Sequence, residues 1–211
     1  MENKVNIICH RGFWKKKSEQ NKIISIKKAI DKYYGIEIDL RDLNNEIIIS
    51  HDPYLSGKKL NFKIFVKKYY KIINKNNTIL ALNIKSDGIY KNLKKILIKY
   101  NINNYFVFDM TIPETLNYKA NKIKFYERYS CYETNLYFNK YSNGVWIDSF
   151  NGKFVFSKKI KKKKMCFVSP ELHKKNNHKS FWKKIKKLKL KNKKIYLCTD
   201  YPNLANKYFN D

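Results

Sequence analysis

The sequence predicts an α/β fold, a compact (β/α)8 barrel of the TIM-barrel type that forms a single domain. Short β-rich apolar runs alternate along the chain with amphipathic, lysine-bearing segments, which is the pattern of a parallel sheet covered by helices. Eight strand candidates can be counted in the 211 residues, and eight strand-helix units close such a barrel. Because 43% of the residues are hydrophobic, the chain suffices for one sizeable core. We therefore expect one domain over residues 1–211.

The predicted elements follow one another along the whole chain. The eight strands run from Val5 to Cys9, Gly35 to Leu40, Ile79 to Lys85, Tyr105 to Asp109, Ile123 to Tyr126, Gly144 to Asp148, Met165 to Val168 and Ile195 to Thr199. Helices whose apolar residues recur on one face are predicted over Lys22 to Tyr34, Phe62 to Ile73 and Tyr90 to Tyr100.

One further short strand is predicted after the second strand. It runs from Glu46 to Ser50 and follows an Asn44-Asn45 turn. Only Pro53 to Thr78 then separates it from the next strand, which is enough for a loop and one helix. We therefore expect no large insertion after the second strand.

The charge of the chain is strongly positive, with 46 basic against 17 acidic residues and a formal net charge of +29. The lysines are spread over the whole sequence, without a basic arm, zinc-ligand spacing or RNA-binding signature, so nucleic acid is not expected as the ligand. AT-rich coding explains the lysine excess. The charge remains compatible with a small anionic substrate or with peripheral contact to an anionic membrane. It does not indicate an oligomeric state.

The four cysteines, Cys9, Cys131, Cys166 and Cys198, lack metal-ligand spacing. They are interpreted as small core residues. No apolar run approaches the ~18 residues of a membrane span, and no secretory signal is evident at the N-terminus. A reduced, cytoplasmic setting is expected.

Arginine and histidine are scarce, and their positions are informative. Only Arg11, Arg41 and Arg128 occur among the 46 basic residues, and arginine is needed chiefly where a planar fork must bind a carboxylate or phosphate. His10 and His51 each follow an apolar run directly. These two histidines are interpreted as the functional pair.

Polar residues gather at the ends of the predicted strands, where barrel enzymes build their active sites. In the second strand, Glu37 and Asp39 are two residues apart and face the same side. Two carboxylates on one side require a cation. Asn83 with Lys85, and Trp146 with Asp148, repeat this spacing. Oxygen ligands of this kind suit Mg²⁺ or Ca²⁺ better than zinc.

Five segments, in order and spacing, resemble the motif series of the glycerophosphodiester phosphodiesterases. They are His10-Arg11-Gly12, Asn21, Glu37-Ile38-Asp39, His51-Asp52-Pro53 and Thr199-Asp200-Tyr201-Pro202. Three further segments resemble the shorter bacterial members found among genes for surface polysaccharides. They are Phe108-Asp109-Met110, Arg128 to Glu133, and Ser169-Pro170-Glu171-Leu172-His173.

This resemblance implies a metal-dependent phosphodiester hydrolase acting on a small glycerol- or sugar-containing phosphodiester. It implies that His10 and His51 are the general acid and base, without deciding which is which. It implies that Arg11 and Lys85 bind the phosphate and that Glu37 and Asp39 bind a divalent metal, Mg²⁺ or Ca²⁺. Whether water or a substrate hydroxyl attacks first stays open. The candidates for contacts to the substrate or for support of the site are Asn21, Asp52, Arg128, Glu133, Trp146 and Asp148.

The chain departs from the family pattern at Asn83, where members usually have a glutamate as third metal ligand. An amide oxygen can still bind a hard cation, but the three ligands then carry two negative charges rather than three. We therefore expect weaker metal binding. Asp87 and Asp148 are candidates to compensate for the missing charge.

Several alternatives stay open at this point. Arg41 either pairs with Asp42 or Glu46 or supports the site, and Arg128 either pairs with Glu133 or reaches the substrate. The alternative functions are a lysophospholipase D-like enzyme at a membrane surface and a catalytically weakened barrel that binds a phosphorylated glycan.

Overall fold

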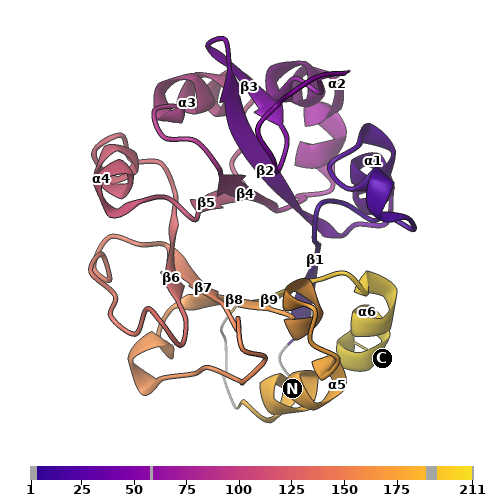
Figure 1. The fold of residues 1–211 in the computed structure, drawn as a ribbon, viewed down its shortest axis with the longest axis vertical. Helices are drawn as coiled ribbons and strands as arrows, with labels where there is room; N and C mark the ends of the chain where they lie inside the picture. The colour runs from indigo at the N-terminus through magenta and orange to yellow at the C-terminus, as the bar shows by residue number, and fades with distance from the viewer. Residues whose placement is uncertain (1–3, 58, 189–193, 211) are drawn as a thin grey trace. The chain divides into compact units, whose positions relative to one another are not determined.

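The computed structural model describes residues 4–57, 59–188 and 194–210. The chain divides into two compact units, His10–Phe125 and Met1–Cys9 with Tyr126–Asp211. We call them the N-terminal unit and the C-terminal unit and describe each by itself. Both contain parallel strands and helices, whose labels are those of Figure 1. The extent of the domain, residues 1–211, stays a prediction.

The sheet of the N-terminal unit has three parallel strands and one antiparallel strand. β2 pairs with β4 and β4 with β5 in parallel, while β3 runs antiparallel to β2. Asn44 and Asn45 join β2 to β3 with φ angles of 51° and 64°, the left-handed backbone of a tight hairpin turn. The extra strand and its turn are therefore as predicted. The strands are β2 (Gly35–Leu43), β3 (Glu46–Ile49), β4 (Leu80–Ile84) and β5 (Tyr105–Phe108).

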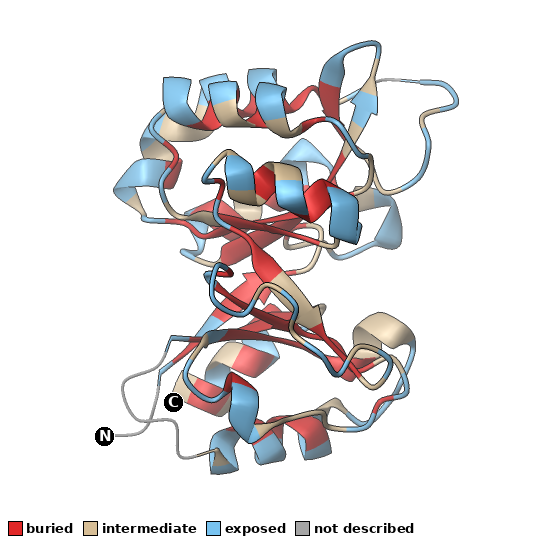
Figure 2. Cartoon of the chain, turned by 90° about the vertical axis from the view of Figure 1, so that its left-hand side faces the viewer, coloured by how far each residue is buried: buried red, intermediate tan, exposed pale blue. Residues whose placement is uncertain are grey.

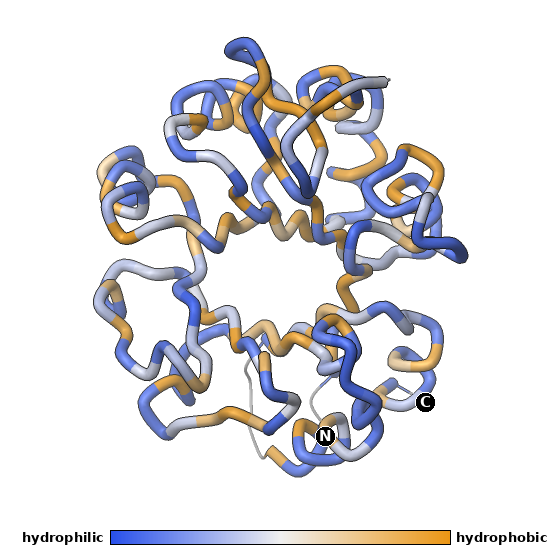
Figure 3. The backbone as a smooth tube through the Cα atoms, viewed as in Figure 1, coloured by the Kyte–Doolittle hydropathy of each residue, from blue (hydrophilic) through white to orange (hydrophobic). Residues whose placement is uncertain are grey.

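The helices of the N-terminal unit bury one apolar face each and expose their lysines. Figure 2 shows buried and exposed residues alternating along them, and Figure 3 shows the matching alternation of hydropathy. Asn61 caps α2 by accepting a hydrogen bond from the Ile64 amide at 3.1 Å, a typical N-cap contact. The helices are the 3-10 helix η1 (Lys17–Glu19), α1 (Ile23–Asp31), α2 (Phe62–Lys75), α3 (Tyr90–Lys99) and α4 (Ile112–Ala120).

In its described residues, the C-terminal unit has five strands, all parallel, in the order β1-β9-β8-β7-β6. They are β1 (Val5–Cys9), β6 (Tyr126–Tyr129), β7 (Gly144–Ile147), β8 (Lys164–Val168) and β9 (Ile195–Thr199). Its helices are the 3-10 helices η2 (Lys158–Ile160) and η3 (Pro170–His173), with α5 (His178–Lys187) and α6 (Pro202–Asn210). None of the helices in the described part of the chain is long and apolar enough to cross a bilayer.

One predicted strand is misplaced. The expected strand over Ile123 to Tyr126 is instead β6, Tyr126–Tyr129, which pairs with β7. Ile123 and Phe125 are buried, 3% and 2% exposed, and this apolar content suggested the strand. Glu127 and Arg128 interrupt the apolar pattern of the true strand, so periodicity alone does not find it.

The cysteines are reduced, and three of them are core residues as predicted. Cys9, Cys166 and Cys198 are 0% exposed. Burial, together with the nearby Asp200, raises the pKa of the Cys9 thiol. Cys131 is partly exposed, so its assignment to the core is wrong.

Candidate active site

Glu37 and Asp39 of β2 are the most deeply buried charged groups in the described part of the N-terminal unit. Glu37 is 1% exposed and Asp39 is 0% exposed. Their neighbours Ile36, Ile38 and Leu40 are also fully buried, so both faces of β2 are covered, as is typical of a parallel strand. Buried carboxylates need positive partners or a metal ion.

Arg11 and Lys85 supply those positive charges from β1–α1 and β4–α3 connecting segments. Arg11 Nε lies 3.0 Å from Asp39 Oδ2, and Lys85 Nζ lies 3.8 Å from Asp39 Oδ1. The backbone amide of Arg11 also donates to Glu37 Oε2 at 3.0 Å. Arg11 has a positive φ of 55°, which turns its amide and its guanidinium toward the two carboxylates. The predicted phosphate-binding pair thus lies beside the predicted metal ligands.

Asp109 is a further carboxylate at this site; the sequence pointed to its segment, Phe108-Asp109-Met110, but did not name Asp109 as a site residue. Its Oδ2 lies 3.2 Å from Lys85 Nζ, so Lys85 lies between Asp39 and Asp109. Asp109 directly follows β5 and has a φ of 73°. Its place at the end of a predicted strand was the available signal, since such ends meet at one edge of the sheet.

Glu37 has a markedly perturbed acidity. Burial, and then the charge of Asp39, raise its pKa to about 7, against the opposing effects of His10 and Arg11. His10 therefore acts electrostatically on Glu37. Its own carbonyl accepts a hydrogen bond from Trp14 Nε1 at 2.9 Å, which ties its backbone to the following turn.

Asn83 lies directly across from Asp39 in the parallel register of β2 and β4. Among the residues that the structure describes, Asp39 Oδ1 and Asn83 Oδ1 are buried and have no hydrogen-bond partner. Unpartnered buried oxygens are unusual, and oxygens of this chemistry fit a hard divalent cation. In the described ranges no three His, Cys, Asp or Glu residues group as a metal site.

His51 lies in the loop after β3 and is held near the strand that carries the carboxylates. The amide of the preceding residue, Ser50, donates to the Asp39 carbonyl at 3.1 Å. His51 Nδ1 lies 2.8 Å from Asp52 Oδ1. This hydrogen bond is the main cause that lowers the pKa of Asp52, with smaller effects from Arg11 and Arg41. Arg11 therefore acts on both the buried carboxylates and the His51 loop.

Asn21 supports Asp39 from the start of α1. Its Nδ2 donates to Asp39 Oδ2 at 2.8 Å, and its amide donates to the Arg11 carbonyl at 2.9 Å. Asn21 is 7% exposed and has a φ of 56°. This places Asn21 among the groups that fix Arg11 and Asp39, and its role toward a substrate stays a prediction.

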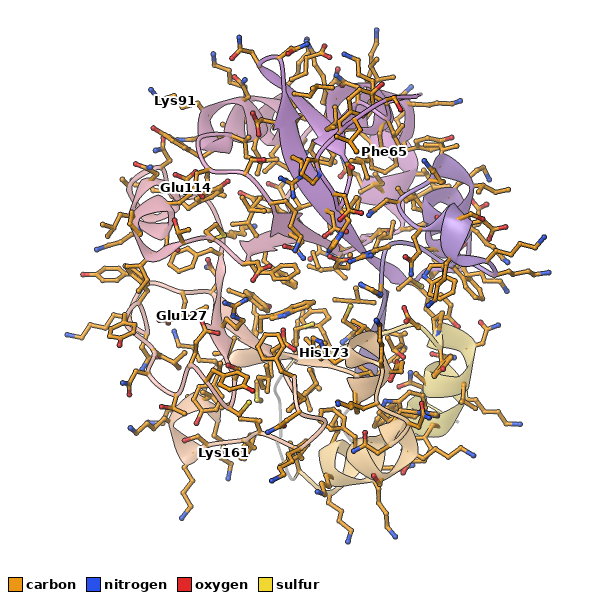
Figure 4. All side chains as sticks on the ribbon, in the orientation of Figure 1. Phe65, Lys91, Glu114, Glu127, Lys161 and His173 are labelled. Carbon is orange, nitrogen blue, oxygen red and sulfur yellow. The ribbon has the colours of Figure 1, made fainter. Side chains whose placement is uncertain are left out.

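The turn after Lys85 is held by α4. Glu114 Oε1, on a side chain that is 4% exposed, accepts a hydrogen bond from the Gly88 amide at 2.9 Å. Figure 4 labels Glu114 on this helix. Asp87 accepts a hydrogen bond from Thr111 Oγ1 at 3.2 Å. Asp87, a candidate to compensate for Asn83, is therefore engaged with α4.

Four other predicted residues lie in the C-terminal unit. Arg128 binds Glu133 through Nε and Nη2, as one alternative held, and its guanidinium lies 5.8 Å from the Phe150 ring centre. Trp146 is 5% exposed and lies across from Arg128 in the sheet register. Asp148 accepts a hydrogen bond from the Ser149 amide and pairs with His173 Nε2.

The pairing of Asp148 with His173 was not predicted from the sequence. His173 ends η3, and its ring stacks near Phe150 with ring centres 4.8 Å apart. Asp148 is thus engaged within the C-terminal unit. The sequence pointed to the segment that ends at His173, but no sequence pattern relates His173 to Asp148.

Comparison with known proteins shows the fold. No protein-family model and no curated protein matches the sequence. A glycerophosphodiester phosphodiesterase from Agrobacterium tumefaciens matches with a TM-score of 0.68 and 10% identity, over 96% of this chain and 99% of that one. An Oleispira antarctica phosphodiesterase, in complex with the product sn-glycerol-3-phosphate, matches with 0.69 and 14%, over 99% and 98%. The predicted class, an α/β fold of the TIM-barrel type with eight parallel strands, is confirmed.

Proposed function

We propose that this protein is a metal-dependent phosphodiester hydrolase that acts on a small glycerol- or sugar-containing phosphodiester. The observation that carries the proposal is the cluster of Arg11 and Lys85 around the buried Asp39, with Glu37 and Asn83 beside it. The structural similarity to the Agrobacterium and Oleispira phosphodiesterases supports this proposal. The product described for the Oleispira enzyme supports a small substrate of this class.

The residues of the site can neutralise and orient an anionic phosphodiester. Arg11 and Lys85 lower the negative charge that an attacking nucleophile meets. Glu37, Asp39 and Asn83 would hold a divalent cation, Mg²⁺ or Ca²⁺. Such a cation, when bound, supplies further stabilisation of charge on the phosphoryl oxygens.

His10 and His51 are the proposed proton carriers. One takes the proton of the nucleophile and the other protonates the leaving alkoxide, which is the usual role of histidine in general acid-base catalysis. Asp52 fixes the orientation of the His51 ring through Nδ1, so the other ring nitrogen is the one directed to the reaction. A surface-polysaccharide precursor as substrate, and action in the cytoplasm, belong to this proposal.

The test is hydrolysis of bis(p-nitrophenyl) phosphate and a panel of glycerophosphodiesters, with EDTA, Mg²⁺ and Ca²⁺ compared side by side. We expect metal-dependent turnover that falls by about 10²- to 10⁴-fold in His10→Ala and in His51→Ala. His178→Ala serves as the matched control, because His178 packs against Trp182 and Tyr201 in the C-terminal unit. Undiminished activity in either of the first two variants would remove its acid/base role.

A second candidate is an enzyme of the lysophospholipase D type, and a cleft beside His51 favours it. The cleft has a volume of about 540 Å³ and includes Ile23, Ile48, Ile49, Tyr54, Leu55 and Leu60. Leu55 is 92% exposed, and Lys22 and Lys59 also line the cleft. Apolar walls with cations suit an amphiphilic anion. Pelleting with anionic liposomes at physiological salt distinguishes this candidate, since a small-substrate enzyme stays in the supernatant.

A further inference from the structure

Arg41 joins the strand of the buried carboxylates to the loop of His51. Its Nη2 donates a hydrogen bond to the His51 carbonyl oxygen at 2.9 Å. Glu46, one of the surface partners considered for it, instead pairs with Lys59 at 3.0 Å. Arg41 is two residues beyond the buried Asp39 on β2. Its side chain therefore connects the loop of His51 to the strand that contains Asp39.

The His51 loop needs such a tie. The side chains of His51 and Asp52 are 42% and 85% exposed and bind each other. An exposed pair of neighbouring residues orients the imidazole ring but does not fix its place relative to β2. Two hydrogen bonds join this loop to β2: the Ser50 amide donates to the Asp39 carbonyl, and Arg41 Nη2 donates to the His51 carbonyl. The second of these contacts the histidine residue itself.

An arginine at this position is not explained by local stability. Arg41 Nε is buried and, within the described ranges, has no hydrogen-bond partner, and a buried donor without a partner lowers stability. Only three of the 46 basic residues are arginine. Where a solvated cation suffices, this chain has lysine. The planar guanidinium instead offers a donor in a fixed direction.

We propose that Arg41 is a positioning residue that holds the His51 loop against β2 for phosphodiester hydrolysis. The proposal rests on the proposed function. Arg41 acts through the His51 carbonyl, so its removal lets the imidazole move away from its working position. Displacement of a catalytic group by about 1 Å can slow a reaction by about 10²-fold. A purely electrostatic role toward the anionic substrate would act on substrate binding instead.

The kinetic test compares Arg41→Met, Arg41→Lys and a matched control, Lys27→Met. Lys27 is an exposed cation on α1 that pairs with Asp31, so its removal changes the net charge equally. We expect kcat to fall by about tenfold to a hundredfold in Arg41→Met, with KM nearly unchanged. Arg41→Lys restores the charge without the fork, and we expect it to recover little of the loss. A raised KM at unchanged kcat, or full recovery by lysine, would overturn the proposal.

Two further measurements separate positioning from a general loss of structure. In Arg41→Met, the imidazole NMR signals of His51 are expected to shift, while those of His178 stay in place. In the Arg41→Met/His51→Ala double variant, kcat should be no lower than in His51→Ala alone, because both changes act through one group. Unmoved His51 signals or additive losses contradict the proposal. If the parent protein hydrolyses no substrate, the proposed function fails, while the NMR comparison still decides the role of Arg41.

Discussion

Asp39 shows how a single residue determines the electrostatics of this site. It is fully buried, contacts the cations of Arg11 and Lys85, and accepts a hydrogen bond from Asn21. A buried charge is tolerated only with such partners. Lys85 also contacts Asp109, with 3.2 Å between Nζ and Oδ2. The amide at Asn83 adds an oxygen without adding charge.

Restoring a carboxylate at position 83 tests the proposed metal site. Asn83→Glu is expected to tighten Mg²⁺ or Ca²⁺ binding by about tenfold or more, because a third anion is added beside Asp39. Isothermal titration calorimetry measures the change directly. The metal-free variant should also unfold at a lower temperature than the parent, since like charges repel. Unchanged metal affinity would exclude position 83 from the ligands.

Gly12 follows the two site residues His10 and Arg11 and has no room for a side chain. Its φ is +91°, and an added Cβ would lie 2.7 Å from Ser25 Oγ and 2.8 Å from the Ser25 carbonyl carbon. Gly12→Ala is therefore expected to lower the free energy of unfolding by about 2–4 kcal/mol.

Gly88→Ala is the matched control for this change. Gly88 has a similar φ of +84° but nothing within 4 Å of an added Cβ, so we expect a loss of only about 1–2 kcal/mol there. Urea unfolding of both variants gives the comparison. Equal losses would show that backbone conformation alone, and not the contact with Ser25, requires Gly12.

At the level of elements, strands of this fold also contain charged residues where packing allows. β6 contains Glu127, whose Oε1 accepts a hydrogen bond from the Phe138 amide at 2.8 Å. Its Oε2 is buried and has no hydrogen-bond partner in the described part of the chain. Burial raises the pKa of Glu127, while the backbone amides of Phe138 and Tyr137 and the charge of Lys163 oppose this effect.

This raised pKa predicts a pH dependence of stability. The folded state binds the Glu127 proton more tightly than the unfolded state, whose carboxyl has an ordinary pKa near 4.5. The stabilising contribution is therefore complete below that value and is lost as the pH rises through the higher folded pKa. Glu127→Gln should unfold with a flatter dependence on pH above about 4.5, as measured by differential scanning calorimetry at a series of pH values. An unchanged slope would contradict the raised pKa.

For the molecule as a whole, the formal charge of +29 is the most unusual property. Lysines of the helices extend from the surface, as Figure 4 shows for Lys91 on α3. Each such charge is nearly neutral for stability. Together they produce a positive field that raises the local concentration of anions, and the range of this field shrinks as salt is added.

We therefore expect kcat/KM to fall several-fold between about 50 and 300 mM KCl for an anionic substrate, with kcat unchanged. Glycerophosphoglycerol, with one net negative charge, and zwitterionic glycerophosphocholine form a matched pair for this experiment. The salt effect should be clearly larger for the anion. Equal salt dependence for both substrates would show that the net charge does not guide substrate to the site.

Much of the fold could be predicted because local patterns encode it. Apolar runs fixed seven of the eight parallel strands within a few residues, and Asn44-Asn45 predicted the hairpin through their tolerance of left-handed backbone. The strand predicted over Ile123 to Tyr126 overlaps β6 only at Tyr126, because two charged residues interrupt the apolar pattern of β6. The spacing of Glu37 and Asp39 predicted a shared face because strand side chains alternate.

The sequence by itself determined the alternation of strands and helices, the shared face of Glu37 and Asp39 on one strand, and the scarcity of arginine. These properties follow from periodicity and composition, which are local. Only the tertiary structure decided that Lys85 lies between Asp39 and Asp109, that Asp148 pairs with His173, and that Arg41 reaches the His51 carbonyl. Such contacts join residues that are distant in the sequence. Which of them form depends on the direction of each side chain and on the path of each loop, and no local pattern encodes either.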